Sequence, residues 1–279
     1  MAALALALAA SLSWGAGDFL GGLAARRLSV ATVLPLTQTV GLVGVAVVVL
    51  VGGSALPGWA NVLAGLGAGV AGVIGLAGLY RGMAIGAMGV VAPISATAAI
   101  LPFVVGLATG DRPSALQLVG VAAAIAGVAL VSREPGGADR STARAAGVGL
   151  ALVAAAGFGG FFVLLDVAAD GGVAWAVLWA RVAGVVLTVA AALVLRAPLT
   201  APRSLLPLIV GIGLFDVGAN VLFGLASSRG LISVVSVLAA LYPVTTVVLA
   251  RLVLGERMSA VQRAGGAAAL AGAALITAG

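Results

Sequence analysis

The stretch D-R-P-S-A-L-Q-L-V-G-V-A-A-A-I-A-G, from Asp111 to Gly127, recurs near the end of the chain as E-R-M-S-A-V-Q-R-A-G-G-A-A-A-L-A-G, from Glu256 to Gly272. Ten of these 17 positions are identical at an offset of 145 residues, and the matches include Arg, Ser, Gln and two Gly. Upstream, S-A-T-A-A-I-L-P (Ser95 to Pro102) matches S-V-L-A-A-L-Y-P (Ser236 to Pro243) at an offset of 141. Such self-similarity indicates an internal duplication.

The composition places this duplicated unit in a lipid bilayer. Of 279 residues, 63% are hydrophobic and only 8% are charged, whereas a soluble domain has about 25% charged residues. A hydrocarbon core of ~30 Å takes about 20 apolar residues per helix. Turn residues and charges divide the chain into ten apolar segments that we expect to span the membrane: 3–25, 30–51, 60–80, 88–108, 115–131, 145–165, 173–195, 205–225, 231–250 and 260–278.

The boundary between the two copies is a polar stretch, Ser132 to Arg144. We therefore predict a first five-helix repeat over residues 1–131, an inter-repeat loop over 132–144 and a second five-helix repeat over 145–279. Because five is odd, the second copy must cross the membrane upside down. The predicted fold is an all-α integral membrane protein with ten transmembrane helices in two inverted repeats around a central cavity, a design typical of secondary transporters.

Several of these motifs resemble one known family. Trp14-Gly15 in the first span, the two Ser…Pro spans, and G-E-R-M-S-A-V-Q-R-A-G-G (Gly255 to Gly266) are similar to the EamA family of the drug/metabolite transporter superfamily. The resemblance covers essentially the whole chain and implies ten helices, a central cavity and export of metabolites or amino acids. Asp111-Arg112-Pro113 departs from the Gly-Glu-Arg that is more usual in the family.

The residue types that are missing exclude other classes of function. The chain has no Cys, no His and no Lys, so thiolate and imidazole chemistry and His-ligated metals are ruled out. We expect no enzyme activity, no cofactor and no metal site. The arginines lie singly or in pairs between apolar runs, which is typical of membrane-flanking loops and not of a nucleic-acid surface. We expect no nucleic-acid partner.

Five polar side chains are expected in the middle third of the bilayer, from a helical rise of about 1.5 Å per residue: Asp18, Gln38, Arg181, Asp216 and Asn220. A charge at mid-bilayer costs ~2.5–3.5 kcal/mol, so it persists where it faces water or a partner. Gln38 and Arg181 are repeat mates, 143 residues apart.

We interpret these residues, with Trp14, as a substrate- and proton-binding site. Asp18 is the expected coupling acid, which binds either a proton or a cationic substrate. Arg181 and Asp216 are the expected ion pair that positions substrate or switches during the cycle. Trp14 is one turn before Asp18 and is suited to stacking on a cation. The alternative is a structural role, in which an Arg181–Asp216 bridge joins two helices and Asp18 is satisfied by Gln38.

Other features concern motion and orientation. The repeat-matched Pro102 and Pro243 each remove an intrahelical hydrogen bond, so we predict that they form a hinge set for alternating access. Eleven arginines fall in the odd-numbered connections and two in the even-numbered ones. By the positive-inside rule this bias predicts both termini outside, whereas the family resemblance suggests both inside.

The leading hypothesis is a multi-pass transporter of a bacterial inner membrane that exports small metabolites, amino acids or drugs, coupled to protons and present as a monomer or homodimer. The use of Arg without Lys and the richness in Ala, Gly and Val suggest a GC-rich bacterium. One alternative is a flippase of a lipid carrier or lipid-linked sugar, in which Arg181 would hold a phosphate. Another is a non-transporting membrane scaffold or channel.

Overall fold

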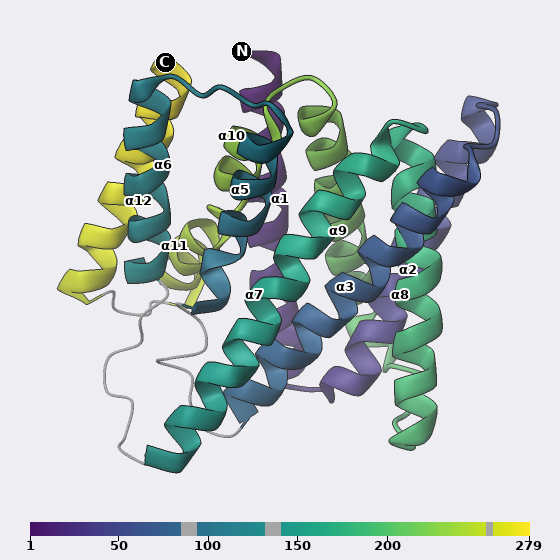
Figure 1. The fold of residues 1–279 in the computed structure, drawn as a ribbon. Helices are drawn as coiled ribbons and strands as arrows, with labels where there is room; N and C mark the ends of the chain where they lie inside the picture. The colour runs from purple at the N-terminus through teal and green to yellow at the C-terminus, as the bar shows by residue number, and fades with distance from the viewer. Residues whose placement is uncertain (85–93, 132–140, 255–258) are drawn as a thin grey trace.

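The chain folds as an assembly of long helices in a computed structural model that describes residues 1–84, 94–131, 141–254 and 259–279 (Figure 1). Within those ranges there is no strand. The elements are α1 (Ala2–Ala25), α2 (Val30–Gly52), α3 (Trp59–Ala84), η1 (Ala96–Ala99), α5 (Ile100–Thr109), α6 (Ala115–Val131), α7 (Ser141–Ala169), α8 (Val173–Val194), η2 (Arg203–Leu205), α9 (Leu206–Ser227), α10 (Ile232–Ala239), α11 (Tyr242–Leu254) and α12 (Ala260–Ala278).

Seven helical stretches in the described part of the chain are long and apolar enough to cross a membrane. They are Ala2–Ala25, Val30–Gly52, Trp59–Leu79, Gly147–Ala169, Val173–Val194, Arg203–Ser227 and Ile232–Leu254. The other three predicted spans correspond to the shorter apolar helices Thr97–Thr109 and Ala115–Val131 and to α12. Three predicted features fall partly outside the described residues: the start of the fourth span, the inter-repeat loop as far as residue 140, and the motif segment 255–258.

The Ser and Gln that match between the repeats form the same cap on two helices. Before α6, the backbone N–H of Gln117 donates to Ser114 Oγ (3.1 Å) and that of Ser114 donates to Gln117 Oε1 (2.9 Å). Ser259 and Gln262 make the same two bonds before α12, at 2.9 and 3.1 Å. Each pair satisfies two backbone donors that a helix start leaves free. The duplicated sequence therefore encodes a duplicated local structure.

The two capped helices pack against each other in opposite directions. Gly120 of α6 lies against Gly272 of α12, and Gly127 lies against Gly265. The order is reversed between the helices, so α6 and α12 are antiparallel. Glycines let two helices approach closely in a bilayer, where no hydrophobic drive brings them together. The conserved spacing of glycines in the two copies therefore builds one self-matched interface.

The larger interfaces also join the first half of the chain to the second. Helix α3 packs along α7 and α8, α1 packs along α9, and α2 packs along α8 and α9. The repeat mates are α1 and α7, α2 and α8, and α3 and α9. When each helix is replaced by its mate, the α3–α7 interface becomes α9–α1 and the α3–α8 interface becomes α9–α2, and both of these interfaces are present. In Figure 1, α1 descends from the N-terminus, whereas α7 rises from the lower grey trace.

The prolines that match between the repeats follow a break in each helix. In the first half, the 3₁₀ turn η1 ends at Ala99 and α5 begins at Ile100, just before Pro102. In the second half, α10 ends at Ala239 and α11 begins at Tyr242, just before Pro243. The predicted spans four and nine are therefore discontinuous at equivalent positions. Proline lacks the N–H that would continue the helical ladder.

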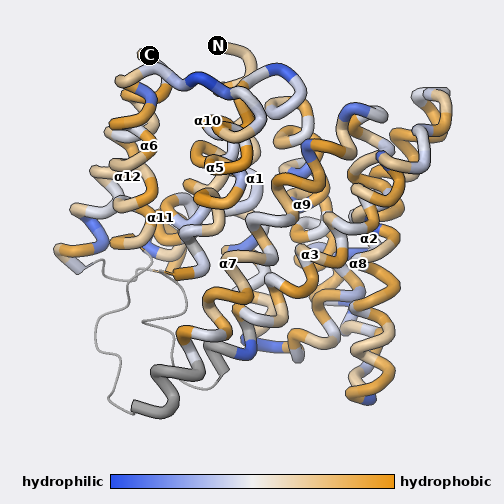
Figure 2. Tube along the Cα trace, in the orientation of Figure 1, coloured by the Kyte–Doolittle hydropathy of each residue, from blue (hydrophilic) through white to orange (hydrophobic). Residues whose placement is uncertain are grey.

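Charge is distributed unequally between the two ends of the molecule. Both termini lie at the upper end in Figure 1, and the polar segments of Figure 2 gather at the ends of the apolar helices. Among the described residues, the arginines at the lower end are Arg26, Arg27, Arg81, Arg144, Arg196, Arg203, Arg251 and Arg263. At this end α1, α3, α8 and α11 finish and α7 and α12 begin. The upper end has Arg112 and Arg229. We refer to the lower end as the arginine-rich face.

The α6–α12 interface generates a stability prediction. We expect Gly127→Ala to lower the melting temperature of the purified protein in detergent, because its Cβ would lie 2.7 Å from the carbonyl oxygen of Gly265. Overpacking of this kind costs roughly 1–3 kcal/mol. The matched control is Gly149→Ala on α7, where an added Cβ meets nothing within 4 Å. Equal melting temperatures for the two variants would contradict this reading of the interface.

Candidate functional site

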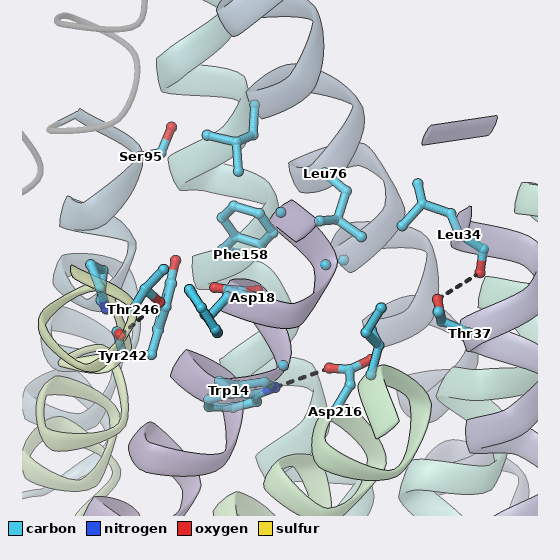
Figure 3. Close-up of a pocket in the computed structure, with 18 of the residues that line it drawn as sticks. Trp14, Asp18, Leu34, Thr37, Leu76, Ser95, Phe158, Asp216, Tyr242 and Thr246 are labelled. Atoms are coloured by element: carbon cyan, nitrogen blue, oxygen red, sulfur yellow. Dashed lines mark hydrogen bonds between the residues drawn. The ribbon is translucent and has the colours of Figure 1, made fainter. Parts of the chain in front are cut away.

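A cavity of about 710 Å³ lies between the two halves of the chain. Helices α1, α2 and α3 of the first half and α7, α8, α9 and α11 of the second line it. All six predicted binding residues are in its wall: Trp14, Asp18, Gln38, Arg181, Asp216 and Asn220. Figure 3 shows Asp18 and Asp216 among the aromatic and aliphatic side chains of this wall. Residues up to 206 positions apart in sequence thus meet in one site.

The centre of the site is an ion pair between two helices of the second half. Arg181 Nη1 on α8 donates to Asp216 Oδ2 on α9 at 2.6 Å, and the same nitrogen donates to Gln38 Oε1 on α2. Arg181 is 3% exposed, whereas Asp216 is 36% exposed. The predicted pairing of Arg181 with Asp216 is therefore present. Asp216 is the member of the pair that the cavity can reach.

The close approach of Arg181 and Gln38 depends on two glycines. Gly184, one turn after Arg181, lies under the Gln38 amide, so an added Cβ would be 3.1 Å from Oε1. Gly41, one turn after Gln38, lies under the Arg181 side chain, 3.4 Å from Cδ and Nε. Gly41 and Gly184 are repeat mates at the same 143-residue offset as Gln38 and Arg181. Gln38 therefore packs on Gly184, and Arg181 packs on Gly41. Because the order of these contacts is reversed between the two helices, α2 and α8 run antiparallel.

The neighbouring helices repeat this reciprocity. Gly69 of α3 packs against Ala180 and Ala183 of α8, and its repeat mate Gly213 of α9 packs against Thr37 and Val40 of α2. Thr37 and Val40 are in turn the repeat mates of Ala180 and Ala183. Any larger residue at either glycine would collide with a backbone carbonyl. The backbone around the cavity therefore has matched halves, although its polar side chains differ.

Trp14 connects α1 to the ion pair. Its indole N–H donates to Asp216 Oδ1 at 3.2 Å (Figure 3) and to Asn220 Oδ1 at 3.1 Å. Asn220 is 3% exposed and one turn from Asp216 on α9. Both oxygens of Asp216 are thus engaged, one by the indole and one by the guanidinium. Asp216 is held in one orientation by two helices besides its own.

Asp18 differs from Asp216 in having no such partner. Its carboxylate accepts no hydrogen bond from any residue that the structure describes, and Gln38 is bonded to Arg181 instead. The side chain is exposed, and it lies in the cavity wall. The proposed satisfaction of Asp18 by Gln38 is therefore not what this structure contains. Asp18 is an accessible carboxylate within a membrane-spanning helix.

Aromatic rings gather around Trp14 at the end of the cavity opposite the arginine-rich face. Trp14 has its ring centre within 6.5 Å of four others: Phe161, Phe162, Phe223 and Tyr242. From this cluster the lining extends past Asp18 to Arg26, Leu254 and Gln262, where α1 and α11 end and α12 begins. The described walls of the cavity therefore lead toward the arginine-rich face.

Sequence reasoning missed the aromatic cluster around Trp14. Phe161 had a usable signal, because at the 143-residue offset it is the repeat mate of Asp18. Phe223 and Tyr242 had none, because their contacts depend on how distant helices pack. Of the two predicted hinge prolines, Pro243 lines the cavity and Pro102 is buried elsewhere.

Comparisons with known proteins agree with the geometry. A family model described as the EamA-like transporter family matches residues 145–278, which confirms the resemblance predicted from the sequence. A solved crystal structure shares the fold with a TM-score of 0.80, at 19% sequence identity over 99% of this chain and 96% of that chain. It is one of 27 matching chains among solved structures. No curated protein matches the chain.

The ion pair yields a test by double substitution. We expect Asp216→Asn to lower the melting temperature strongly, because it leaves the buried Arg181 cation without a counter-charge. Breaking a buried pair costs roughly 3–5 kcal/mol where the remaining charge is kept from water. Adding Arg181→Gln should restore much of the lost stability, because the site is then neutral. If the double variant is as unstable as the sum of the two single variants, the coupling does not exist.

Proposed function

We propose that the chain, whose residues 145–278 match the EamA-like transporter family, is a secondary-active exporter of small metabolites, amino acids or drugs that exchanges its substrate for protons by alternating access. The family is one of multi-pass membrane transporters that are generally not enzymes. The observation that carries the proposal is Asp18, an unpaired carboxylate that faces a cavity between the two halves of the chain.

Alternating access is supported by the packing of repeat mates. The pairs α2–α8 and α6–α12 are each antiparallel, as expected if the two five-helix units are inverted with respect to each other. An inverted repeat has two states of similar energy, because each half can adopt the conformation of the other. The described lining extends toward the arginine-rich face, and the aromatic cluster around Trp14 lies at the other end; we infer that this cluster closes that end in this state. The exchanged arrangement would close the first end and open the second.

Coupling to protons is supported by the different environments of the two carboxylates. Asp216 already accepts hydrogen bonds from a guanidinium and an indole N–H, so its charge is paired. Asp18 has neither, and a charge at this depth is costly unless a cation or a proton neutralises it. One acid can hold one of the two at a time. This competition makes substrate release depend on proton binding, which is the requirement for exchange.

The direction of transport follows from the orientation proposed for the chain. If the arginine-rich face is cytoplasmic, as the positive-inside rule predicts, this conformation is open to the cytoplasm and loads substrate there. Protons entering from the other side would then release it outside. Export driven by the proton gradient is the cycle that this arrangement supports best.

The flippase alternative is less well supported by the site. It requires Arg181 to bind a phosphate, but its Nη1 already serves Asp216 and Gln38, and its other nitrogens have almost no accessible surface. A scaffold or channel is disfavoured for a different reason. Neither needs a costly unpaired carboxylate inside a cavity closed at one end.

The proposed function is tested in proteoliposomes. We expect the purified protein to drive movement of a substrate from a mixture of amino acids and amines when a pH gradient is imposed, and to move protons the opposite way. Asp18→Asn should abolish the dependence on the pH gradient, because Asn cannot bind a proton in this range. The readouts are mass spectrometry of the lumen and a pH-sensitive dye. Gradient-driven transport by Asp18→Asn at the wild-type rate would refute the coupling role.

The prolines after the two helix breaks are tested separately. We expect Pro102→Ala with Pro243→Ala to slow turnover at least tenfold while changing substrate affinity much less, because restored helical hydrogen bonds would stiffen both breaks. Transport rate and equilibrium binding are measured on the same preparations. An unchanged turnover number would show that the breaks do not act as hinges.

A further inference from the structure

We propose that the cavity takes a singly charged organic cation with an apolar body, whose positive group pairs with Asp18. This inference rests on the proposed function, because it names the substrate class of the same cavity. It goes beyond that function by excluding anions and by assigning the two ends of the substrate to opposite walls.

The charge balance at the depth of Asp18 is negative. The charged residues in the described lining are Asp18, Arg26, Arg181 and Asp216. Arg181 and Asp216 neutralise each other at 2.6 Å. Arg26 lies two turns beyond Asp18, about 12 Å along the axis by the helical rise. One uncompensated negative charge is therefore left at the centre, which favours a ligand with one positive charge.

An anionic group would have no partner at this depth. The guanidinium of Arg181 is the only cation near the centre among the described lining residues. Its Nη1 is engaged, and Nε and Nη2 expose less than 1 Å² each. A carboxylate or phosphate would therefore face Asp18 without a donor of opposite charge. Burying a charge without such a partner is strongly unfavourable.

The positions equivalent to Asp18 and Asp216, each in the opposite copy of the repeat, form an apolar wall. The repeat mate of Asp18 is Phe161, at an offset of 143 residues. The repeat mate of Asp216 is Gly72, at an offset of 144 residues, which is also the offset between Gly69 and Gly213. An added Cβ at Gly72 would lie 3.4 Å from the Phe161 ring. Asp18 and Asp216, one acid from each half, thus have a phenyl ring and the glycine under it at their equivalent positions.

Further apolar side chains extend this second wall. They are Phe158 of α7 and Val73, Leu76 and Leu79 of α3. Such a surface binds an aromatic or aliphatic body, and ring faces also attract cations. A cavity of about 710 Å³ lies within the ~300–1,000 Å³ range of small-molecule sites. A charged head on the α1 side and an apolar body on the α3–α7 side satisfy both walls together.

The test uses three probes that share a phenyl body and differ in charge: phenethyltrimethylammonium, 3-phenylpropionate and L-phenylalanine. Binding to the full chain in detergent is measured by titration calorimetry. We expect the cation to bind at least tenfold more tightly than the anion or the zwitterion. Its affinity should fall as the pH is lowered, because protons compete for Asp18 while the quaternary nitrogen cannot lose its charge.

Variants assign the effect to one carboxylate. Asp18→Asn should weaken the cation at least tenfold, and Asp18→Glu should retain most of the affinity. The control is Asp170→Asn, an exposed acid beyond the end of α7, which should bind like the wild type. Tighter binding of the anion or zwitterion would overturn the inference, as would unchanged cation affinity in a folded Asp18→Asn. If Asp18→Asn does not fold, the wild-type pH series decides, and a flat series overturns the inference.

The outcomes also separate this inference from the proposed function. Cation binding that depends on Asp18, without gradient-driven movement in proteoliposomes, supports the substrate class and refutes the transport cycle. Gradient-driven transport of an anion or a zwitterion that depends on Asp18 does the reverse. Each result therefore identifies which of the two ideas is wrong.

Discussion

A guanidinium buried among apolar helices must be neutralised where it lies, and this constraint organises the centre of the molecule. Arg181 is 3% exposed, so its charge is satisfied by Asp216 from α9 and by Gln38 from α2. Three helices from both halves of the chain are held together by one nitrogen atom. Glycines at positions 41 and 184 make this possible, because larger side chains would push the helices apart. The cavity wall forms around this contact.

The two halves share a backbone arrangement but not a chemistry. Gln38 corresponds to Arg181, Asp18 to Phe161, and Gly72 to Asp216. Reciprocal glycine contacts keep the helices of the two halves in equivalent packing. The substitutions at equivalent positions put all of the charge on one wall. Duplication accounts for the scaffold around the cavity, and divergence of a few side chains accounts for its polarity.

The sequence was sufficient to predict the helices and several of the polar side chains that line the cavity. Apolar runs interrupted by turns predicted the helix positions to within a few residues, because a bilayer demands long apolar segments. Charges at mid-span marked Asp18, Arg181 and Asp216, because only a cavity or a partner tolerates them there. The bond between Gln38 and Arg181, and hence the unpaired state of Asp18, was beyond prediction. It depends on the rotation of α2 and α8 about their axes, as the rings around Trp14 depend on distant contacts.

Helix α1 gives the molecule a mechanical property of its own. Trp14 and Asp18 are one turn apart on the same rod, without a proline or a break between them. The indole anchors that rod to α9, while the carboxylate is exposed in the cavity wall. A force on the carboxylate is thus transmitted directly to the indole anchor, over a single helical turn. Trp14 and Asp18 therefore move together as parts of one rigid body.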